Sequence, residues 1–272
     1  EEDVPMEIIE EWLGTDAFAE RVVRQHRSLM WLNVSNQRLL SNDMGLSVTS
    51  TGLHYRGGLS DNYRGDDNVP CLDVPAQFDL EGYPIQEALA DETFREGYVM
   101  VEPYWAPGTE IKVCAYDAQE HLISPRGTDC SNNERGSSYN DFGCGCGPNL
   151  RWCSMGRNYA GAAEVLDALT RDVEMRIQAN IQNNEPYLDL FQSSRGFVNG
   201  PLVHFWRYWA GHSDYLDAEP SPMPMDQLPD LEWSDMDTWV EIQLPEYHAG
   251  LLTAPAFLIR FQTNRGRANR FY

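Results

Sequence analysis

Apolar residues recur at helical spacing in two stretches that flank a long middle part without such periodicity. Residues 5–33 predict the first helical stretch, with Thr15 or Asp16 as its cap. The apolar residues near one face are Phe18, Val22, Leu29 and Met30. His26 lies on this helix, and no second histidine or cysteine follows three or four residues away. We therefore expect His26 to bond a backbone or acidic group rather than a metal.

The middle part, residues 42–157, differs in character. Gly, Pro, Asn, Asp and Ser recur every few residues, and all six cysteines lie here. Two runs, GYVMVEPYW and GTEIKVCAYDA, have the composition of strands, and the APG between them predicts a turn. Loops of this length are uncommon in a compact domain unless they are cross-linked or functional. We therefore predict a cysteine-rich β/loop insertion.

Helical spacing returns in residues 158–272. The apolar stripe of the first helix predicted there consists of Leu166, Leu169, Val173, Ile177 and Ile181. The run GPLVHFWRYWAG predicts a second, aromatic-rich helix, and a Pro- and acid-rich linker follows it. The resulting expectation is an α-rich α+β fold, a helical frame with a long disulfide-linked insertion. We expect one domain over 1–272, a piece of a longer chain.

Acidic residues outnumber basic ones by 42 to 20, which gives a formal net charge of −22. A nucleic-acid partner would need a basic patch acting against this field, so we expect no nucleic acid. The charge indicates a solvated acidic surface or, as the alternative, cation binding. No run of 18 apolar residues occurs, so no membrane span is predicted.

The cysteines bear on the cellular compartment. An even number confined to a Gly- and Pro-rich region indicates a disulfide framework, and hence an extracytoplasmic protein in the periplasm, at the cell surface or secreted. The cysteines are Cys71, Cys114, Cys130, Cys144, Cys146 and Cys153. Their spacing fits structural zinc poorly, and neither Cys-x-x-Cys nor Cys-x-x-Cys-His occurs. A metal site and free thiols are the alternatives. We expect Cys144 and Cys146 to bond different partners, and the pairing stays open.

The loop LSDNYRGDDNVPCLD is a candidate calcium site because it is dense in hard oxygen ligands. Its candidate ligands are Asp61, Asp66, Asp67 and Asp73. The spacing is not that of an EF-hand loop, so a solvated loop is the alternative.

Catalytic residues are not apparent in the sequence. No serine-hydrolase, metalloprotease, phosphate-loop or dinucleotide motif occurs. The run HFWRYWAGHSDY contains His204, Trp206, Trp209 and His212. Aromatic residues at this spacing predict core packing, and a sugar-binding cleft is the alternative.

The last residues are basic in an otherwise acidic chain. Four arginines gather there: Arg260, Arg265, Arg267 and Arg270. They could pair with acidic surface of the same chain, or with carboxylates of a partner or cofactor. These four are the candidate partner-docking residues.

The C-terminal run HAGLLTAPAFLIRFQTNRGRANRFY resembles a segment of uncharacterised secreted multidomain proteins of planctomycetes and myxobacteria, which contain domains of unknown function and c-type haem motifs. The run WLGTDAFAERVVRQHRSLMW resembles, less specifically, the helical domain that precedes this segment. The resemblance implies a haem motif after the segment, so haem is expected only in a neighbouring segment. It implies no activity for particular residues.

Three functional hypotheses follow. The first is an extracytoplasmic non-catalytic module of a haem-associated electron-transfer protein, which packs against or presents a redox or catalytic neighbour. That neighbour is a protein partner or the remainder of its own longer chain. The second is a secreted carbohydrate-active enzyme or binding protein, with carboxylates and Trp206 and Trp209 in a cleft. The third is a calcium-dependent surface assembly or adhesion subunit. We expect no cofactor in this chain itself, with calcium as the alternative.

Overall fold

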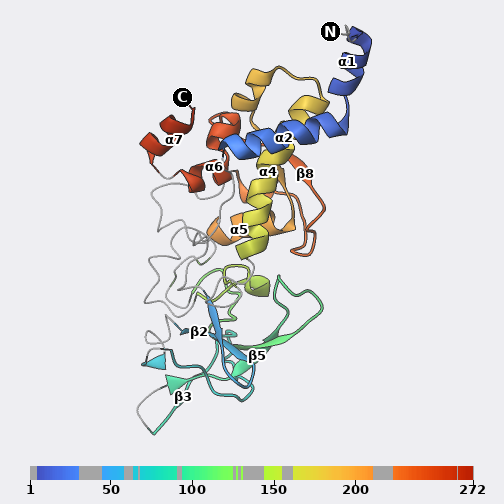
Figure 1. Cartoon of the computed structure of the whole chain (residues 1–272). Coiled ribbons are helices and arrows are strands. Elements are labelled where there is room, and N and C mark those ends of the chain that lie inside the picture. The colour runs from blue at the N-terminus through green and yellow to red at the C-terminus, as the bar shows by residue number, and fades with distance from the viewer. Residues whose placement is uncertain are drawn as a thin grey trace. The chain divides into compact units, whose positions relative to one another are not determined.

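A computed structural model of the chain describes residues 5–30, 45–57, 64–66, 68–90, 94–124, 127, 130, 144–154, 162–210, 223–261 and 263–271. The chain divides into two compact units, each built from segments far apart in the sequence. The first unit comprises Glu1–Gln37, Glu164–Leu202 and Met236–Tyr272, and the second comprises Arg38–Ala163 and Val203–Asp235. Figure 1 labels the main elements of both.

The described residues form a mixed α/β fold, and the α-rich class predicted from the sequence is wrong. Six α-helices accompany eight short strands in this part of the chain, arranged in one four-stranded and two two-stranded sheets. The antiparallel pair β7 (Arg195–Val198) and β8 (Val240–Gln243) lies within residues 158–272, which the sequence assigned to helix. The segment RGFV does not alternate, and VEIQ alternates over four residues, the shortest run that indicates a strand, which explains the error.

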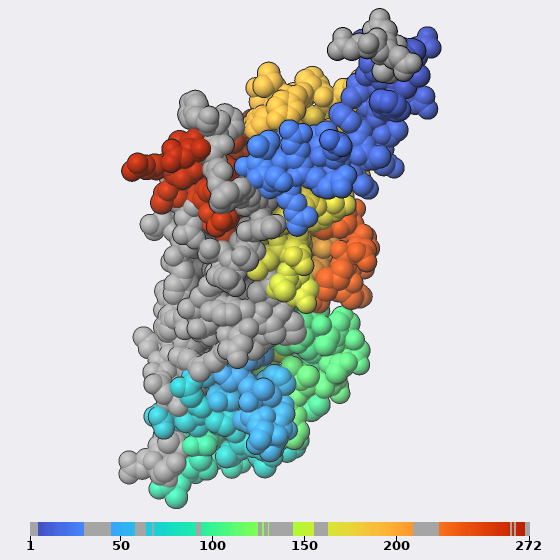
Figure 2. Space-filling view, in the orientation of Figure 1, coloured from blue at the N-terminus to red at the C-terminus, as the bar shows by residue number. Residues whose placement is uncertain are grey.

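Two helices replace the single one expected over residues 5–33. They are α1 (Met6–Leu13) and α2 (Asp16–Met30). Thr15 caps α2 as predicted, because its Oγ1 accepts a hydrogen bond of 3.3 Å from the backbone N of Phe18. No residue of α1 is buried, and Figure 2 shows this helix (dark blue) projecting beyond α2.

The predicted apolar stripe forms the buried face of α4 (Ala162–Gln182), with Leu169, Val173 and Ile177 at most 1% exposed. On the same helix Asp172 and Arg176 form a buried, two-bond ion pair, with Nε–Oδ1 at 2.9 Å and Nη2–Oδ2 at 2.8 Å. Oδ1 of Asp172 also accepts the backbone N–H of Phe197 at 2.8 Å, which ties α4 to β7.

The remaining elements of the first unit are short. They are the 3₁₀ turns Tyr187–Phe191 and Gly250–Thr253 and the helices α6 (Pro255–Arg260) and α7 (Asn264–Phe271). His26 bonds as expected, since its Nδ1 lies 2.9 Å from the backbone O of Val22. Its Nε2 lies 3.0 Å from the hydroxyl of Tyr187, which joins α2 to the first of these turns.

The second unit is built on a sheet of order β1-β2-β6-β5. The strands are β1 (Leu46–Val48), β2 (Leu53–Arg56), β5 (Tyr98–Val101) and β6 (Ile111–Cys114). Strands β2 and β6 are parallel, and the other pairs are antiparallel. The two predicted strand runs are β5 and β6, and the predicted turn between them is present, because Thr109 N donates to Ala106 O at 3.1 Å.

The core of the second unit lies between this sheet and the aromatic-rich helix. Leu46, Val113 and Leu150 pack with Tyr208 of α5 (Gly200–Ala210), the helix predicted from its aromatic run. The other elements of this unit are β3 (Glu87–Ala88), β4 (Phe94–Arg95) and the 3₁₀ turns Pro148–Leu150 and Met225–Gln227. Residues 200–202 of α5 belong to the first unit.

Candidate functional site

All six cysteines form disulfides, which confirms the disulfide framework predicted from their number and surroundings. The pairs are Cys71–Cys114, Cys130–Cys144 and Cys146–Cys153. As expected, Cys144 and Cys146 have different partners. The bonds close loops of 43, 14 and 7 residues and lie wholly within the second unit. Each bond therefore restricts the unfolded chain in a region rich in loops.

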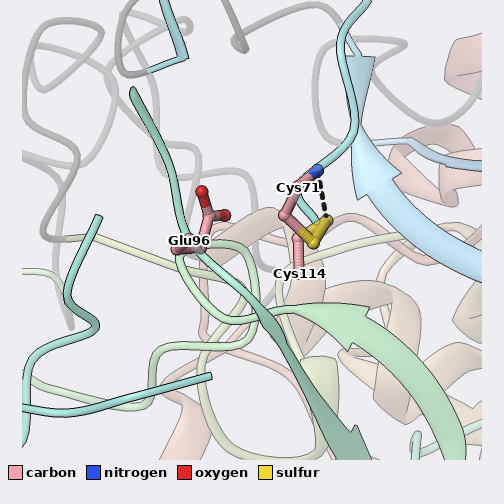
Figure 3. Close-up of side chains that lie close together, drawn as sticks. All are labelled: Cys71, Glu96 and Cys114. Carbon is pink, nitrogen blue, oxygen red and sulfur yellow. Dashed lines mark hydrogen bonds between the residues drawn. A yellow bond between two sulfur atoms is a disulfide. The ribbon is translucent and has the colours of Figure 1, made fainter. Parts of the chain in front are cut away.

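One cluster among the described residues has the composition of a metal site, namely Cys71, Glu96 and Cys114. Figure 3 shows its two sulfur atoms joined to each other, and the backbone N of Cys71 donates to Sγ of Cys114 at 3.1 Å. Metal ligation by cysteine needs a thiolate, and both sulfurs are in the disulfide. Glu96 forms an ion pair with Arg64. The oxidised cluster is therefore a structural cross-link beside a buried ion pair.

That ion pair belongs to a network of four buried charges. Arg64 contacts both Glu96 and Asp117, and Arg56 donates from Nε to Oδ1 of Asp117 at 2.8 Å. The side chains of all four are at most 4% exposed. Arg56 lies on β2, and Asp117 follows β6. The network therefore connects the segments that contain Arg64 and Glu96 to this parallel pair of strands. Two positive and two negative groups balance, as burial requires.

The candidate calcium ligands are only partly described. Asp61 and Asp67 lie outside the described residues, and Asp66 is exposed. Oδ1 of Asp73 lies 2.9 Å from Nζ of Lys112, and this hydrogen bond lowers the pKa of the Asp73 carboxyl. No described group of three carboxylates that includes Asp66 or Asp73 lies close enough to hold an ion. Calcium binding stays a prediction.

The C-terminal arginines are mostly directed to solvent. Arg260 on α6 and Arg265 on α7 are exposed and form no ion pair with any described residue. Arg267 is half-buried, and its Nε donates to the backbone O of Phe261 at 2.7 Å. Arg270 lies on α7, but its side chain is outside the described part. Internal pairing is thus not observed for Arg260 and Arg265.

The aromatic run of α5 is core, as the spacing predicted, and Trp206 is 7% exposed. The side chain of Trp209 and all of His212 fall outside the described residues. The ring of His204 stacks on Tyr104, with centroids 4.8 Å apart. Burial lowers the pKa of His204 to about 4, and the nearby Arg207 guanidinium adds to this effect. His204 is therefore neutral near pH 7.

The first unit contains an open groove of about 740 Å³, here called the α4 groove. One wall is the face of α4 that bears Glu164, Asp167 and Arg171, spaced i, i+3 and i+7. The opposite wall includes Asp237 and Trp239, which precede β8. In Figure 2 the surfaces of α2 (blue), α4 (yellow) and the residues near β8 (orange) meet.

Polar contacts hold both walls of the α4 groove in place. Glu174 is buried, and its Oε1 lies 3.2 Å from Nη1 of Arg27 on α2. Its Oε2 accepts a bond of 3.0 Å from Nη1 of Arg171. On the opposite wall Nδ2 of Asn199 donates to the backbone O of Met236 at 2.9 Å. The groove therefore exists before any ligand enters.

The charges of the α4 groove do not balance within it. In the described part of its lining there are four carboxylates and two guanidinium groups, and Glu174 engages both arginines. The other three carboxylates, Glu164, Asp167 and Asp237, are exposed and bond no described residue. The half-buried indole of Trp239 adds an apolar surface. These groups suit a ligand that carries positive charge or many hydroxyl groups.

Sequence reasoning missed this groove because its walls come from segments about 70 residues apart in the chain. The only local signal was the polar stripe of Glu164, Asp167 and Arg171 on a helix whose other face is apolar. Such a stripe is also what any solvated helix shows. Among the described residues, none of those proposed from the sequence as calcium ligands, cleft aromatics or docking arginines lines the α4 groove.

No helix of the described part is long and apolar enough to cross a membrane. No protein-family model matches the chain, and neither a curated protein nor a solved structure matches it significantly.

Proposed function

We propose that this chain is an extracytoplasmic binding module that performs no chemistry of its own. The observation that carries the proposal is the α4 groove, a pre-formed depression of about 740 Å³ with an aromatic side chain and three carboxylates that bond no described residue. A groove whose walls are already fixed binds without the entropic cost of ordering them. The occupant is a segment of a protein partner or of the remainder of a longer chain.

The three disulfide bonds support the proposed extracytoplasmic compartment. Three disulfides persist in oxidising surroundings, such as the periplasm, the cell surface or the extracellular medium, and are rare in the cytosol. The haem-bearing neighbour implied by the sequence resemblance is one form that the partner could take. In that case the module holds or orients a redox segment, and this chain supplies no haem ligand.

The proposal that this chain performs no chemistry is tested by an assay for turnover. The described side chains that line the groove include no cysteine, serine or histidine, and both oxygens of Glu174 are held by arginines. The oxidised protein is incubated with chromogenic esters and soluble polysaccharides, and release of chromophore or reducing sugar is measured. We expect neither. Turnover that is lost in the double variant Asp167→Asn/Asp237→Asn would overturn the proposal.

A second candidate, a secreted enzyme acting on polysaccharide, is favoured by one observation. Carboxylates and Trp239 line the same groove, and glycoside hydrolysis needs two carboxyl groups about 5–10 Å apart beside a sugar-binding surface. The aromatic surface is Trp239 rather than Trp206, which is buried in the core. The reducing-sugar assay separates this candidate from a module without turnover.

A further inference from the structure

We propose that the α4 groove receives an extended basic peptide segment, rich in arginine or lysine. This inference rests on the proposed function, because it names the class of occupant of the same groove. It is carried by the arrangement of charge on the two walls of the groove and by the aromatic side chain on one of them.

Unpaired negative charge is present on both walls. Glu164 and Asp167 lie one helical turn apart on α4, and Asp237 lies on the opposite wall. None of the three bonds a described residue. A guanidinium group that enters the groove can therefore form charge-assisted hydrogen bonds with carboxylates for which no described residue competes. A segment with cations at successive positions can reach both walls, because successive side chains of an extended chain point in opposite directions.

The aromatic residue fits the same occupant. The indole of Trp239 is half-buried on the wall that also carries Asp237. Trp is the best cation–π partner among side chains, and arginine is the cation found most often over it. Met236, on the same wall, is 36% exposed and can cover the aliphatic part of a long basic side chain.

The charges disfavour the other classes of ligand. An anionic segment would meet three unpaired carboxylates, while the two groove arginines already contact Glu174. A neutral oligosaccharide could stack on Trp239 and bond the carboxylates. Because it carries no charge, however, the net charge of −22 on the chain would not attract it. A basic segment gains from that field in both encounter rate and local concentration.

The test is calorimetric titration of the oxidised protein with a capped hexapeptide of arginine. The same peptide with citrulline for arginine controls for shape, and cellohexaose represents a neutral sugar. We expect the citrulline peptide to bind at least tenfold more weakly than the arginine peptide. Raising the salt concentration from 50 to 500 mM should weaken the arginine peptide further, because screening reduces attraction between exposed charges.

Variants locate the binding in the groove. The double variant Asp167→Asn/Asp237→Asn should raise the Kd of the arginine peptide about tenfold, and Trp239→Leu should also raise it. The matched control Glu81→Gln/Glu87→Gln removes the same charge from exposed positions in the second unit and should change the Kd less than twofold. Thermal unfolding of each variant verifies that it is folded.

Three outcomes would overturn the inference. Equal weakening by the groove and control variants would show general attraction to an acidic surface. Tighter binding of cellohexaose than of the arginine peptide, lost in Trp239→Leu, would assign the groove to carbohydrate instead of a protein segment, while the chain would remain a binding module without turnover. Failure of the arginine peptide to bind would reject a basic occupant. Turnover of a substrate would overturn the proposed function itself.

Discussion

The Nη2 atom of Arg64 lies 2.9 Å from Oδ2 of Asp117, and both side chains are fully buried. Nη2 also contacts Glu96, so a single guanidinium group holds two carboxylates in the interior of the second unit. Such an arrangement contributes little net stability compared with apolar packing, but it makes each member indispensable once the others are present. It explains how a unit rich in loops and short strands keeps one arrangement.

Removing Arg64 should therefore destabilise the protein severely. We expect Arg64→Met to lower the free energy of unfolding by about 3–5 kcal/mol, because Glu96 and Asp117 lose a buried counter-ion. Urea unfolding followed by circular dichroism measures the change. The exposed pair of Lys112 and Asp73 in the same unit provides the control, since Lys112→Met should change the unfolding midpoint far less. Similar effects of the two substitutions would contradict the buried network.

The three disulfides should contribute unequally. Cys71–Cys114 closes 43 residues and Cys146–Cys153 closes 7, so chain entropy gives about 4 kcal/mol for the first and about 2.5 kcal/mol for the second. Replacing each pair by alanines and measuring urea unfolding tests this order. A larger loss from the Cys146–Cys153 variant would show that packing around that bond, rather than loop length, sets its contribution.

Acid should destabilise the first unit partly through Glu185. The hydrogen bond from Arg195 lowers the pKa of Glu185 below its usual 4.5, so the unfolded state takes up the proton first as the pH falls. The stabilisation is therefore complete above about pH 5 and is lost as the pH falls through the pKa of the folded state. Glu185→Gln should lose less stability between pH 7 and pH 3 than the wild-type protein. Glu81→Gln, at an exposed position, should retain the full acid sensitivity.

His204 should make the stability of the folded protein depend on pH in a higher range, between about 4 and 6.5. Because burial lowers its pKa from 6.5 to about 4, the unfolded state binds a proton between these values while the folded state does not. This contribution to stability is present above pH 6.5 and falls as the pH is lowered to 4. An NMR titration of the His204 ring in the folded protein measures the pKa directly. A midpoint near 6.5 would contradict the burial of the ring against Tyr104.

The exposed C-terminal arginines should matter little to folding. Arg260 and Arg265 form no ion pair with described residues, whereas Arg176 forms a buried one with Asp172. We expect Arg260→Ala/Arg265→Ala to leave the midpoint of thermal unfolding almost unchanged and Arg176→Ala to lower it clearly. A large shift in the double variant would instead indicate the internal pairing that the sequence also allowed.

The sequence revealed those features that depend on neighbours along the chain. The stripe of Leu169, Val173 and Ile177 predicted α4, and Thr15 predicted the start of α2. The composition around the cysteines predicted disulfides. Their pairing was not predictable, because Cys71 and Cys114 are 43 residues apart in the chain and only the fold brings them together.

Features that depend on contacts between distant segments could not be read from the sequence. The ion pair of Asp73 with Lys112 was not visible in the sequence because the two residues are 39 positions apart. The strand Arg195–Val198 was hidden because its partner, Val240–Gln243, is remote and equally short. The α4 groove combines Asp167 with Asp237 in the same way. In each case the missing information was long-range pairing, which local periodicity does not carry.

The central claim, an oxidised extracytoplasmic module, is tested most directly by mass spectrometry of the protein isolated from its native source. The protein is denatured and alkylated without reductant, and its intact mass is compared with that of a reduced sample. The structure predicts no alkylation and a mass six hydrogens below that of the reduced chain, because all six cysteines are paired. Six alkylated cysteines would contradict the disulfides and, with them, the proposed compartment.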